Sequence, residues 1–389
     1  MKDVENKVHE IFNIISKRVE INDFSLLSGE TGIILFIQQY NSFFKTESEI
    51  VSRLQKCFDL IEGDSNVSLS YCSGVSGFVW LCYYFEKIGL IDKDANLVED
   101  IYPYILKSAF LDISIGYYDF LHGAIGKAIC LIKKVDNNTI SEIEKLIELI
   151  DRNKMKSEAG IFWVQNHNGK PHVNFGLSHG IPAMIYFLTE CYSKKIKNEC
   201  CEHLVQESLK FIRHYKNVSS TTSLYPLLFS INEINPTSNH RLCWCWGDLG
   251  VALVFLKAGK VFNNSEWVSE AIDIMHHSSK RNDLVTDRIV DAGLCHGTSG
   301  IAHIFNRFYF ETDLPEFRKS AEFWFQETLK MAYHKKGLAG FCAGHQVDTG
   351  MDTWENEYGL LEGIAGIGLT LISYLSKEEP SWDECLLIS

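Results

Sequence analysis

The sequence predicts an all-α protein, an α/α toroid in which a ring of seven inner helices lies inside a ring of seven outer helices. Two observations support this fold class. A glycine turn is followed by an apolar run seven times along the 389 residues, and the first glycines of the turns lie 45 to 67 residues apart. Amphipathic segments fall between these runs. A repeat of this length holds two helices, and such units bury their apolar faces by stacking on their neighbours.

The seven turns share a small residue at the first and fourth positions. They are residues 29–32, 74–77, 123–126, 180–183, 247–250, 297–300 and 363–366. We expect the first glycine to adopt a left-handed conformation and the second to let the next helix start in close backbone contact. Pro182 fits a helix start, because proline is favoured in the first turn of a helix. The fourth turn has Ala183 where the others have glycine, so a small side chain suffices there.

The runs after the turns are apolar nearly all round, which is typical of buried helices, as in 33–37, 78–85 and 251–256. The segment 141–150 is amphipathic instead, with one face formed by Ile143, Leu146, Ile147 and Ile150. Ser141 and Glu144 fit a capping box at its start. Buried helices that alternate with one-sided helices favour an inner and an outer ring.

Two stretches interrupt the helical pattern. Residues 161–175 resemble a short β-hairpin, with Asn168 and Gly169 in the turn. Residues 217–240 are rich in Ser, Thr, Asn and Pro, and they predict a long loop of functional significance. No clear boundary divides the chain, so we expect one domain over residues 1–389.

Composition narrows the functional classes. The chain is 46% hydrophobic and 22% charged, as in a soluble globular protein, and its formal charge of −13 argues against nucleic-acid binding. The polar first residues are unlike a secretory signal, and no stretch of 18 uncharged apolar residues predicts a membrane span. The twelve scattered cysteines suggest reduced thiols and a cytoplasmic location.

Cysteine and histidine accompany the fifth and sixth turns, in the motifs Trp-Cys-Trp-Gly and Leu-Cys-His-Gly. We predict that Cys245, Cys295 and His296 bind one zinc ion, because thiolate and imidazole are preferred zinc ligands and a catalytic site uses three protein ligands. Buried cysteines more often act as small hydrophobic residues. Cys243 competes with Cys245 for the role, and weaker candidates are Cys200, Cys201 and His203, and Cys342 with His345.

With these motifs on a sevenfold glycine-turn repeat, the chain resembles the lanthionine synthetase C-like (LanC) cyclases over essentially its whole length. Gly-Leu-Ser-His-Gly at 176–180 is similar to a family motif, as is Tyr-Asp-Phe-Leu-His-Gly at 118–123. Arg241 matches a family arginine four residues before Cys245. Trp246 departs from the pattern, because many members carry a tyrosine there, and an indole N–H cannot shuttle a proton.

The resemblance implies a zinc-dependent cyclase that adds peptide cysteine thiols to dehydroalanine or dehydrobutyrine, giving (methyl)lanthionine rings. It implies that His179 protonates the enolate, that Asp119 orients His179, and that Arg241 stabilises the enolate oxygen or positions Asp119. Trp244, Trp246 and His122 are the expected substrate-binding residues. The implied partners are a dehydrated precursor peptide, a dehydratase and a peptide exporter, which would bring this cytoplasmic protein to the inner face of the membrane.

Other functions fit the same architecture. The main alternative is a non-catalytic, zinc-containing protein that binds thiols, glutathione or peptides. A protein prenyltransferase would need an Asp-x-Cys zinc pair and a basic diphosphate pocket, and a glycoside hydrolase would need a second carboxylate opposite Asp119. Without the family resemblance, His179 is equally a helix-start residue bonded to backbone, and Asp119 a helix cap.

Overall fold

The computed structural model describes residues 1–18, 20–48, 50–92, 97–167, 170–230, 236, 241–346 and 352–389. Contacts divide the chain into two compact units. The first unit comprises residues 1–68, 72–81 and 282–388, and the second comprises 69–71, 82–281 and 389. The expectation of a single domain stays a prediction.

Each of the seven glycine turns begins a helix. These helices are α2 (Glu30–Phe44), α4 (Val75–Lys87), α6 (Ala124–Leu131), α8 (Ile181–Ser193), α10 (Asp248–Val261), α12 (Thr298–Thr312) and α14 (Ile364–Leu375). Their first two turns are buried on every side, and all of α6 is buried. The prediction that the apolar runs form buried helices is confirmed.

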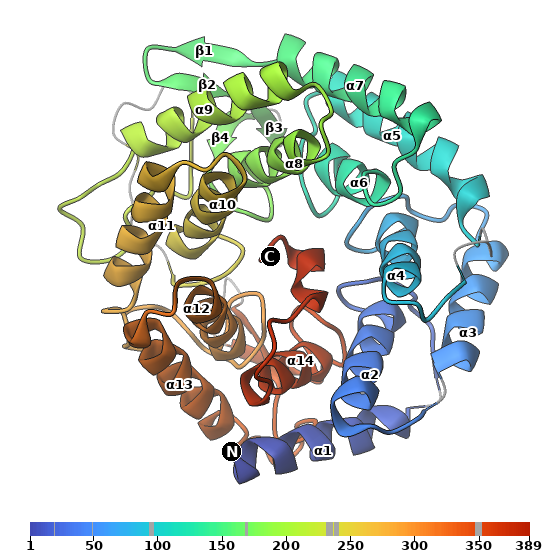
Figure 1. The fold of residues 1–389 in the computed structure, drawn as a ribbon. Helices are drawn as coiled ribbons and strands as arrows, with labels where there is room; N and C mark the ends of the chain where they lie inside the picture. The colour runs from blue at the N-terminus through green and yellow to red at the C-terminus, as the bar shows by residue number, and fades with distance from the viewer. Residues whose placement is uncertain are drawn as a thin grey trace. The chain divides into compact units, whose positions relative to one another are not determined.

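A second set of helices has only one buried face. These are α1 (Lys2–Ser16), α3 (Ile50–Gly63), α5 (Tyr102–Ser114), α7 (Asn137–Arg152), α9 (Asn198–His214), α11 (Ser265–Ser278) and α13 (Pro315–Lys330). Within the second unit, α5 packs on α6, α9 on α8 and α11 on α10; within the first, α3 packs on α2 and α13 on α12 (Figure 1). In these five pairs a buried helix packs against a one-sided helix, as predicted.

The helix α7 shows where the sequence prediction of a helix start was wrong. Its predicted face of four aliphatic residues is fully buried. The helix begins at Asn137, however, so Ser141 lies inside it and cannot cap it. Asp136 caps it instead: its side chain accepts the Thr139 N–H at 2.8 Å, and the Thr139 hydroxyl accepts the Asp136 N–H at 2.8 Å.

The two expectations for the turn glycines are confirmed only in part. Gly247 has a φ of +83°, so the left-handed interpretation holds there. It is wrong for five other first glycines, which are extended N-caps: Gly29, Gly123, Gly180, Gly297 and Gly363. Close contact explains the second glycine of the third turn, because a Cβ at Gly126 would overlap the carbonyl oxygen of Phe120.

Three small antiparallel sheets complete the described fold. In the second unit β1 (Met155–Ser157) pairs with β2 (Gly160–Phe162), and a further sheet has the order β3–β4–β5. Its strands are β3 (Gln165–His167), β4 (Lys170–Asn174) and β5 (Leu228–Ser230). In the first unit β6 (Ala343–Gln346) pairs with β7 (Asp352–Glu355).

The predicted hairpin is confirmed by β3 and β4, which pair Gln165 with His172 and His167 with Lys170. Its predicted turn, Asn168 and Gly169, lies outside the described residues. The long segment 217–240 contributes the strand β5, which the sequence analysis did not predict, and which pairs with β4. The β1–β2 and β6–β7 pairs were not predicted either.

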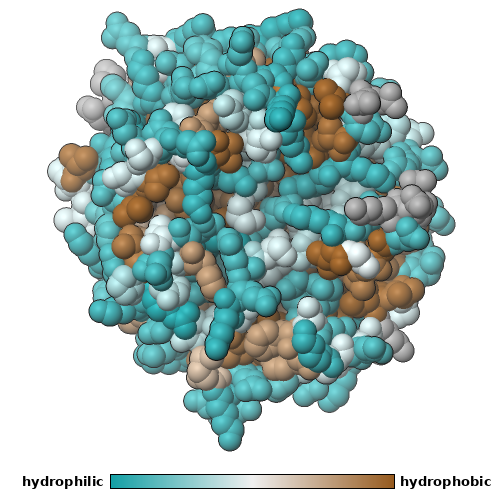
Figure 2. Space-filling view, in the orientation of Figure 1, coloured by the Kyte–Doolittle hydropathy of each residue, from teal (hydrophilic) through white to brown (hydrophobic). Residues whose placement is uncertain are grey.

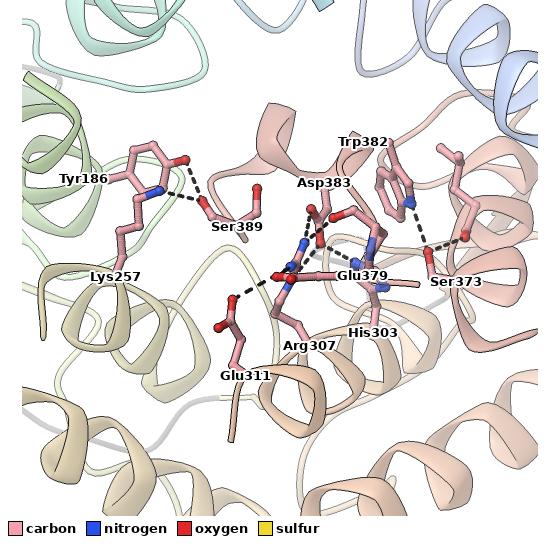
Figure 3. Close-up of polar contacts among 12 residues, drawn as sticks. Tyr186, Lys257, His303, Arg307, Glu311, Ser373, Glu379, Trp382, Asp383 and Ser389 are labelled. Carbon is pink, nitrogen blue, oxygen red and sulfur yellow. Dashed lines mark hydrogen bonds and ion pairs between the residues drawn. The ribbon is translucent and has the colours of Figure 1, made fainter. Parts of the chain in front are cut away.

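In the first unit a buried arginine joins α12 to the short 3-10 helix η3 (Trp382–Leu386) (Figure 3). The Arg307 guanidinium donates to both Asp383 carboxylate oxygens, at 2.6 and 3.2 Å, and to the Pro380 carbonyl at 2.5 Å. His303 Nε2 lies 2.9 Å from Asp383 Oδ2. The indole N–H of Trp382 donates to the Ser373 hydroxyl at 2.9 Å. These bonds attach the C-terminal segment to α12 and α14.

The surface is mostly hydrophilic in the view of Figure 2, where hydrophobic residues form separate patches. Among the described residues, no helix combines the length and the apolar character that a membrane crossing requires.

Candidate functional site

A pocket of about 630 Å³ lies within the second unit. One wall is the β3–β4–β5 sheet, and the others come from the turns before α6, α8 and α10. The lining residues are Tyr117, Asp119, His122, Gln165, Asn166, Lys170, Pro171, His172, Asn174, His179, Leu228, Ser230 and Trp246. Two predicted catalytic residues, His179 and Asp119, thus share a pocket with two predicted substrate-binding residues, His122 and Trp246.

His179 and Asp119 are hydrogen-bonded to each other in this pocket. The Nδ1 atom of His179 lies 2.5 Å from the Oδ2 atom of Asp119, although the residues are 60 positions apart. Asp119 is buried at 7% exposure, and His179 is half-buried. The contact leaves Nε2 as the ring nitrogen that can meet a bound molecule. A short charge-assisted bond of this kind fixes the imidazole orientation.

Three further contacts hold both partners in place. The second oxygen of Asp119 accepts the His122 N–H at 2.8 Å, so the carboxylate is bonded on both sides. The Gln165 side-chain amide donates to the His179 carbonyl at 2.6 Å, which ties the α8 turn to the sheet. The Trp246 ring contacts the His179 ring edge-on, with centroids 5.6 Å apart. The pair is therefore held by three separate segments.

Tyr117 and Gln165 are pocket residues that the sequence analysis missed. Desolvation, with the nearby carboxylates of Asp119 and Asp112, raises the pKa of Tyr117 to about 12, so its phenol stays protonated at neutral pH. Tyr117 directly precedes the family-like motif at 118–123, and that proximity was the available signal. Nothing comparable pointed to Gln165, because its place depends on the pairing of β3 with β4.

The predicted ligand Cys245 is buried in the second unit. Its carbonyl accepts the backbone N–H of Ser178 at 3.3 Å and the Ser178 hydroxyl at 3.1 Å, which places the Cys245 turn against the turn that carries His179. Its sulfur lies 3.7 Å from the sulfur of Cys243, and both side chains are buried. The competing cysteine is therefore a direct neighbour of Cys245.

The other two predicted ligands, Cys295 and His296, belong to the first unit. The Cys295 N–H donates to the Leu361 carbonyl at 2.9 Å, and Cys295 is 8% exposed. His296 is half-buried, with Nε2 3.7 Å from Asp291 Oδ2. Asp291 also accepts the backbone N–H groups of Gly293 and Gly344.

Two thiols and one imidazole suit zinc by their chemistry. Within each unit, the described residues contain no group of three or more cysteine, histidine or acidic side chains close enough to hold a metal ion. The zinc assignment stays a prediction.

The weaker cysteine candidates do not form ligand groups among the described residues. In α9 Cys201 is buried and His203 is exposed. Burial raises the pKa of Cys201 to about 12, which disfavours the thiolate that a metal needs. The half-buried Cys342 donates to Asn356 at 3.6 Å, and the side chain of His345 is outside the described residues.

Two further predicted residues lie apart from the pocket lining. Arg241 is half-buried and is not among the lining residues. Trp244 is fully buried, which is typical of a core side chain. Their predicted roles at the enolate and the substrate stay predictions.

Comparison of the sequence and the structure with known proteins identifies the family of this chain. The model of the family described as lanthionine synthetase C-like protein matches residues 5–387. The chain belongs to this family. The nisin biosynthesis protein NisC of Lactococcus lactis subsp. lactis is 23% identical over 185 residues, and the match spans 44% of this chain and 42% of that relative.

A solved structure of a protein called nisin cyclase matches this family member with a TM-score of 0.74 at 19% identity. The match covers 100% of this chain and 97% of that one. This likeness shows the fold, and the predicted α/α-toroid class is confirmed.

Proposed function

We propose that this protein is a zinc-dependent lanthipeptide cyclase, which joins peptide cysteine thiols to dehydroalanine or dehydrobutyrine. The observation that carries the proposal is the His179–Asp119 pair, 2.5 Å apart in a pocket large enough for a peptide side chain and its neighbours. A thiol addition to a dehydro residue leaves an enolate, which needs a proton donor at the α-carbon. Family membership and the names of the relatives agree with this chemistry.

Cys245, Cys295 and His296 are the residues that would hold zinc. A bound zinc ion lowers the pKa of a coordinated thiol, so a substrate cysteine would be deprotonated at neutral pH. Two protein thiolates already balance the charge of Zn²⁺, and a third thiolate therefore keeps its nucleophilic character.

The chain's own groups provide the remaining chemistry. Asp119 holds His179 Nδ1 and stabilises the protonated imidazole, so Nε2–H can deliver a proton to the α-carbon of the enolate. Trp246 and residues of the β3–β4–β5 sheet line the pocket in which this step would occur. Trp246 offers no phenol at its position in the motif, and we assign the proton transfer to His179.

The direct test is ring formation on a dehydrated precursor peptide. We expect the purified protein with zinc to consume free peptide thiols faster than an identical reaction without protein, measured by thiol alkylation and mass spectrometry. The no-enzyme reaction is the necessary control, because dehydrated peptides cyclise slowly unaided. Peptide or glutathione binding without faster ring closure would favour the non-catalytic alternative.

Zinc stoichiometry tests the proposed ligands. We expect one zinc per chain, and loss of zinc from Cys245→Ala and from Cys295→Ala, because each removes one of three protein donors. Elemental analysis of the purified variants measures this, with Cys57→Ala, a buried cysteine of α3, as the control. Full zinc in both ligand variants would contradict the assignment.

The partners follow from the same proposal. The substrate would be a precursor peptide that a dehydratase has already modified, and an exporter would take the product. We expect the protein to act in the cytoplasm and to reach a membrane only through these partners.

A further inference from the structure

The proposed mechanism leaves one atom of the intermediate without a partner in the pocket. When a thiolate adds to the β-carbon of a dehydro residue, the electron pair of the double bond shifts and negative charge develops on the carbonyl oxygen. His179 is assigned to the α-carbon, and Arg241, the predicted donor to the oxygen, is not among the residues that line the pocket. A fixed hydrogen-bond donor at this oxygen would lower the barrier, because it meets the charge as it develops.

Tyr117 places a phenol in the wall of this pocket. It lies in the turn that precedes α6, two residues before Asp119, and it lines the pocket together with Asp119 and His179. All three residues belong to the second unit. The Tyr117 side chain is 39% exposed, so its ring is open to a bound molecule.

Backbone hydrogen bonds fix Tyr117 on both sides. Its N–H donates to the Asp112 carbonyl in the last turn of α5 at 2.8 Å, and its carbonyl accepts the N–H of Ala124, the first residue of α6, at 3.0 Å. Within the same turn, the Gly123 N–H donates to the Asp119 carbonyl at 3.1 Å. The phenol and the carboxylate that holds His179 therefore belong to one hydrogen-bonded turn.

The protonation state of Tyr117 is that of a hydrogen-bond donor. Desolvation raises the pKa of its phenol to about 12, and the carboxylates of Asp119 and Asp112 add to the shift. The hydroxyl keeps its proton at neutral pH and can donate a hydrogen bond without losing it. The side-chain amide of Gln165, another donor in the pocket wall, already bonds to the His179 carbonyl at 2.6 Å.

We propose that the Tyr117 hydroxyl donates a hydrogen bond to the carbonyl oxygen of the dehydro residue as that oxygen becomes an enolate. This inference rests on the proposed cyclase function. The carbon–sulfur bond forms, the double-bond pair moves toward the oxygen, and Tyr117 stabilises the charge without transferring its proton. His179 Nε2–H then protonates the α-carbon and the carbonyl is restored. The thiol proton has left to solvent, and the imidazole regains a proton from solvent.

Tyr117→Phe tests the inference, because it keeps the ring and removes only the hydroxyl. Loss of one such donor typically lowers kcat by about 10²–10³-fold. We expect a fall in this range for ring closure, with KM unchanged, because the bond strengthens only as the charge develops. Ring stereochemistry should remain that of the wild type, because His179 still delivers the proton.

The matched control is Tyr118→Phe. This neighbouring tyrosine is buried and does not line the pocket, so its loss of a hydroxyl should leave kcat close to the wild-type value. Thiol alkylation with mass spectrometry over a range of precursor concentrations gives kcat and KM, and chiral analysis of the hydrolysed rings gives the stereochemistry. Tyr117→Phe keeps the backbone bonds of a partly exposed residue, so its urea midpoint should match that of the wild type.

The outcomes separate this inference from the proposed function. If the wild type is no faster than the reaction without protein, the cyclase function fails and the role of Tyr117 fails with it. If the wild type is active and Tyr117→Phe has the same kcat, the hydroxyl is not the donor, although the cyclase function stands. A higher KM at an unchanged kcat, or equal losses in Tyr117→Phe and Tyr118→Phe, would likewise overturn the inference, since the first indicates binding alone and the second a disturbed turn.

Discussion

His179→Ala is expected to slow ring closure by about 10²–10⁴-fold, the usual contribution of a general acid or base. The imidazole lines the pocket, and its Nδ1 atom is occupied by Asp119 at 2.5 Å, so one ring nitrogen remains for the substrate. An alanine removes that donor and leaves the enolate to water. Zinc content should be unchanged, because His179 is not a proposed ligand.

Thiol alkylation with mass spectrometry on a dehydrated precursor gives the rate, and chiral analysis of the hydrolysed rings gives the stereochemistry. His214→Ala, an exposed histidine in the last turn of α9, controls for the loss of a histidine elsewhere in the same unit. If His179→Ala cyclises the peptide at the wild-type rate and with the wild-type stereochemistry, His179 is not the proton donor and has only a structural role at the start of its helix.

Asp119→Asn tests how much the Asp119 carboxylate contributes to the activity of His179. The amide keeps the shape of the carboxylate, and its oxygen can still accept the His122 N–H. It removes the negative charge that stabilises a protonated His179, so the rate should fall with zinc retained. A variant as active as the wild type would show that Asp119 only shapes the turn before α6.

The fold was predictable because its signals are local and repeated. Each glycine turn precedes a buried helix, and α7 buries the four aliphatic residues that share its predicted face. The helix start was misplaced because Asp136 and Thr139 compete as a cap with Ser141 and Glu144, and the sequence does not rank two plausible caps. The close contact expected of the second glycine is confirmed at Gly126. The left-handed conformation expected of the first glycines was wrong at five turns, because a glycine before a helix can equally be an extended N-cap and the local sequence does not distinguish the two.

The candidate site was predictable only in part. His179, Asp119, His122 and Trp246 stand in motifs, and the structure brings all four to one pocket. The sheet wall was not foreseen, because β5 comes from a segment whose composition indicates a loop. Short strands gain their stability from pairing partners distant in sequence, and a single strand of three residues carries no periodic signal. Arg241 and Trp244 also stand in or near these motifs, but neither side chain lines the pocket. A motif match therefore does not indicate which side chains reach the pocket.

Asp383→Asn is expected to destabilise the first unit by about 3–5 kcal/mol, because it leaves the buried Arg307 guanidinium without its main counter-charge. Both side chains are at most 1% exposed. Glu379→Gln is the matched control, because Glu379 pairs with the same arginine but is 54% exposed. An exposed ion pair contributes at most about 1 kcal/mol to stability. The free energy of unfolding of the control should therefore be close to that of the wild type.

The pH dependence of unfolding distinguishes lost charge pairing from lost packing. Burial alone would raise the pKa of Asp383, but the charges of Arg307 and His303 outweigh it and hold the pKa below its ordinary value. A carboxyl with a lowered folded-state pKa stabilises the fold above its unfolded pKa of about 3.9, and this contribution is lost as pH falls through the folded value. The gap between the urea midpoints of wild type and Asp383→Asn should therefore be constant near neutral pH and shrink only below about pH 4. A gap that stays the same in acid would mean that the asparagine disturbs packing around η3, and that the ion pair itself contributes little.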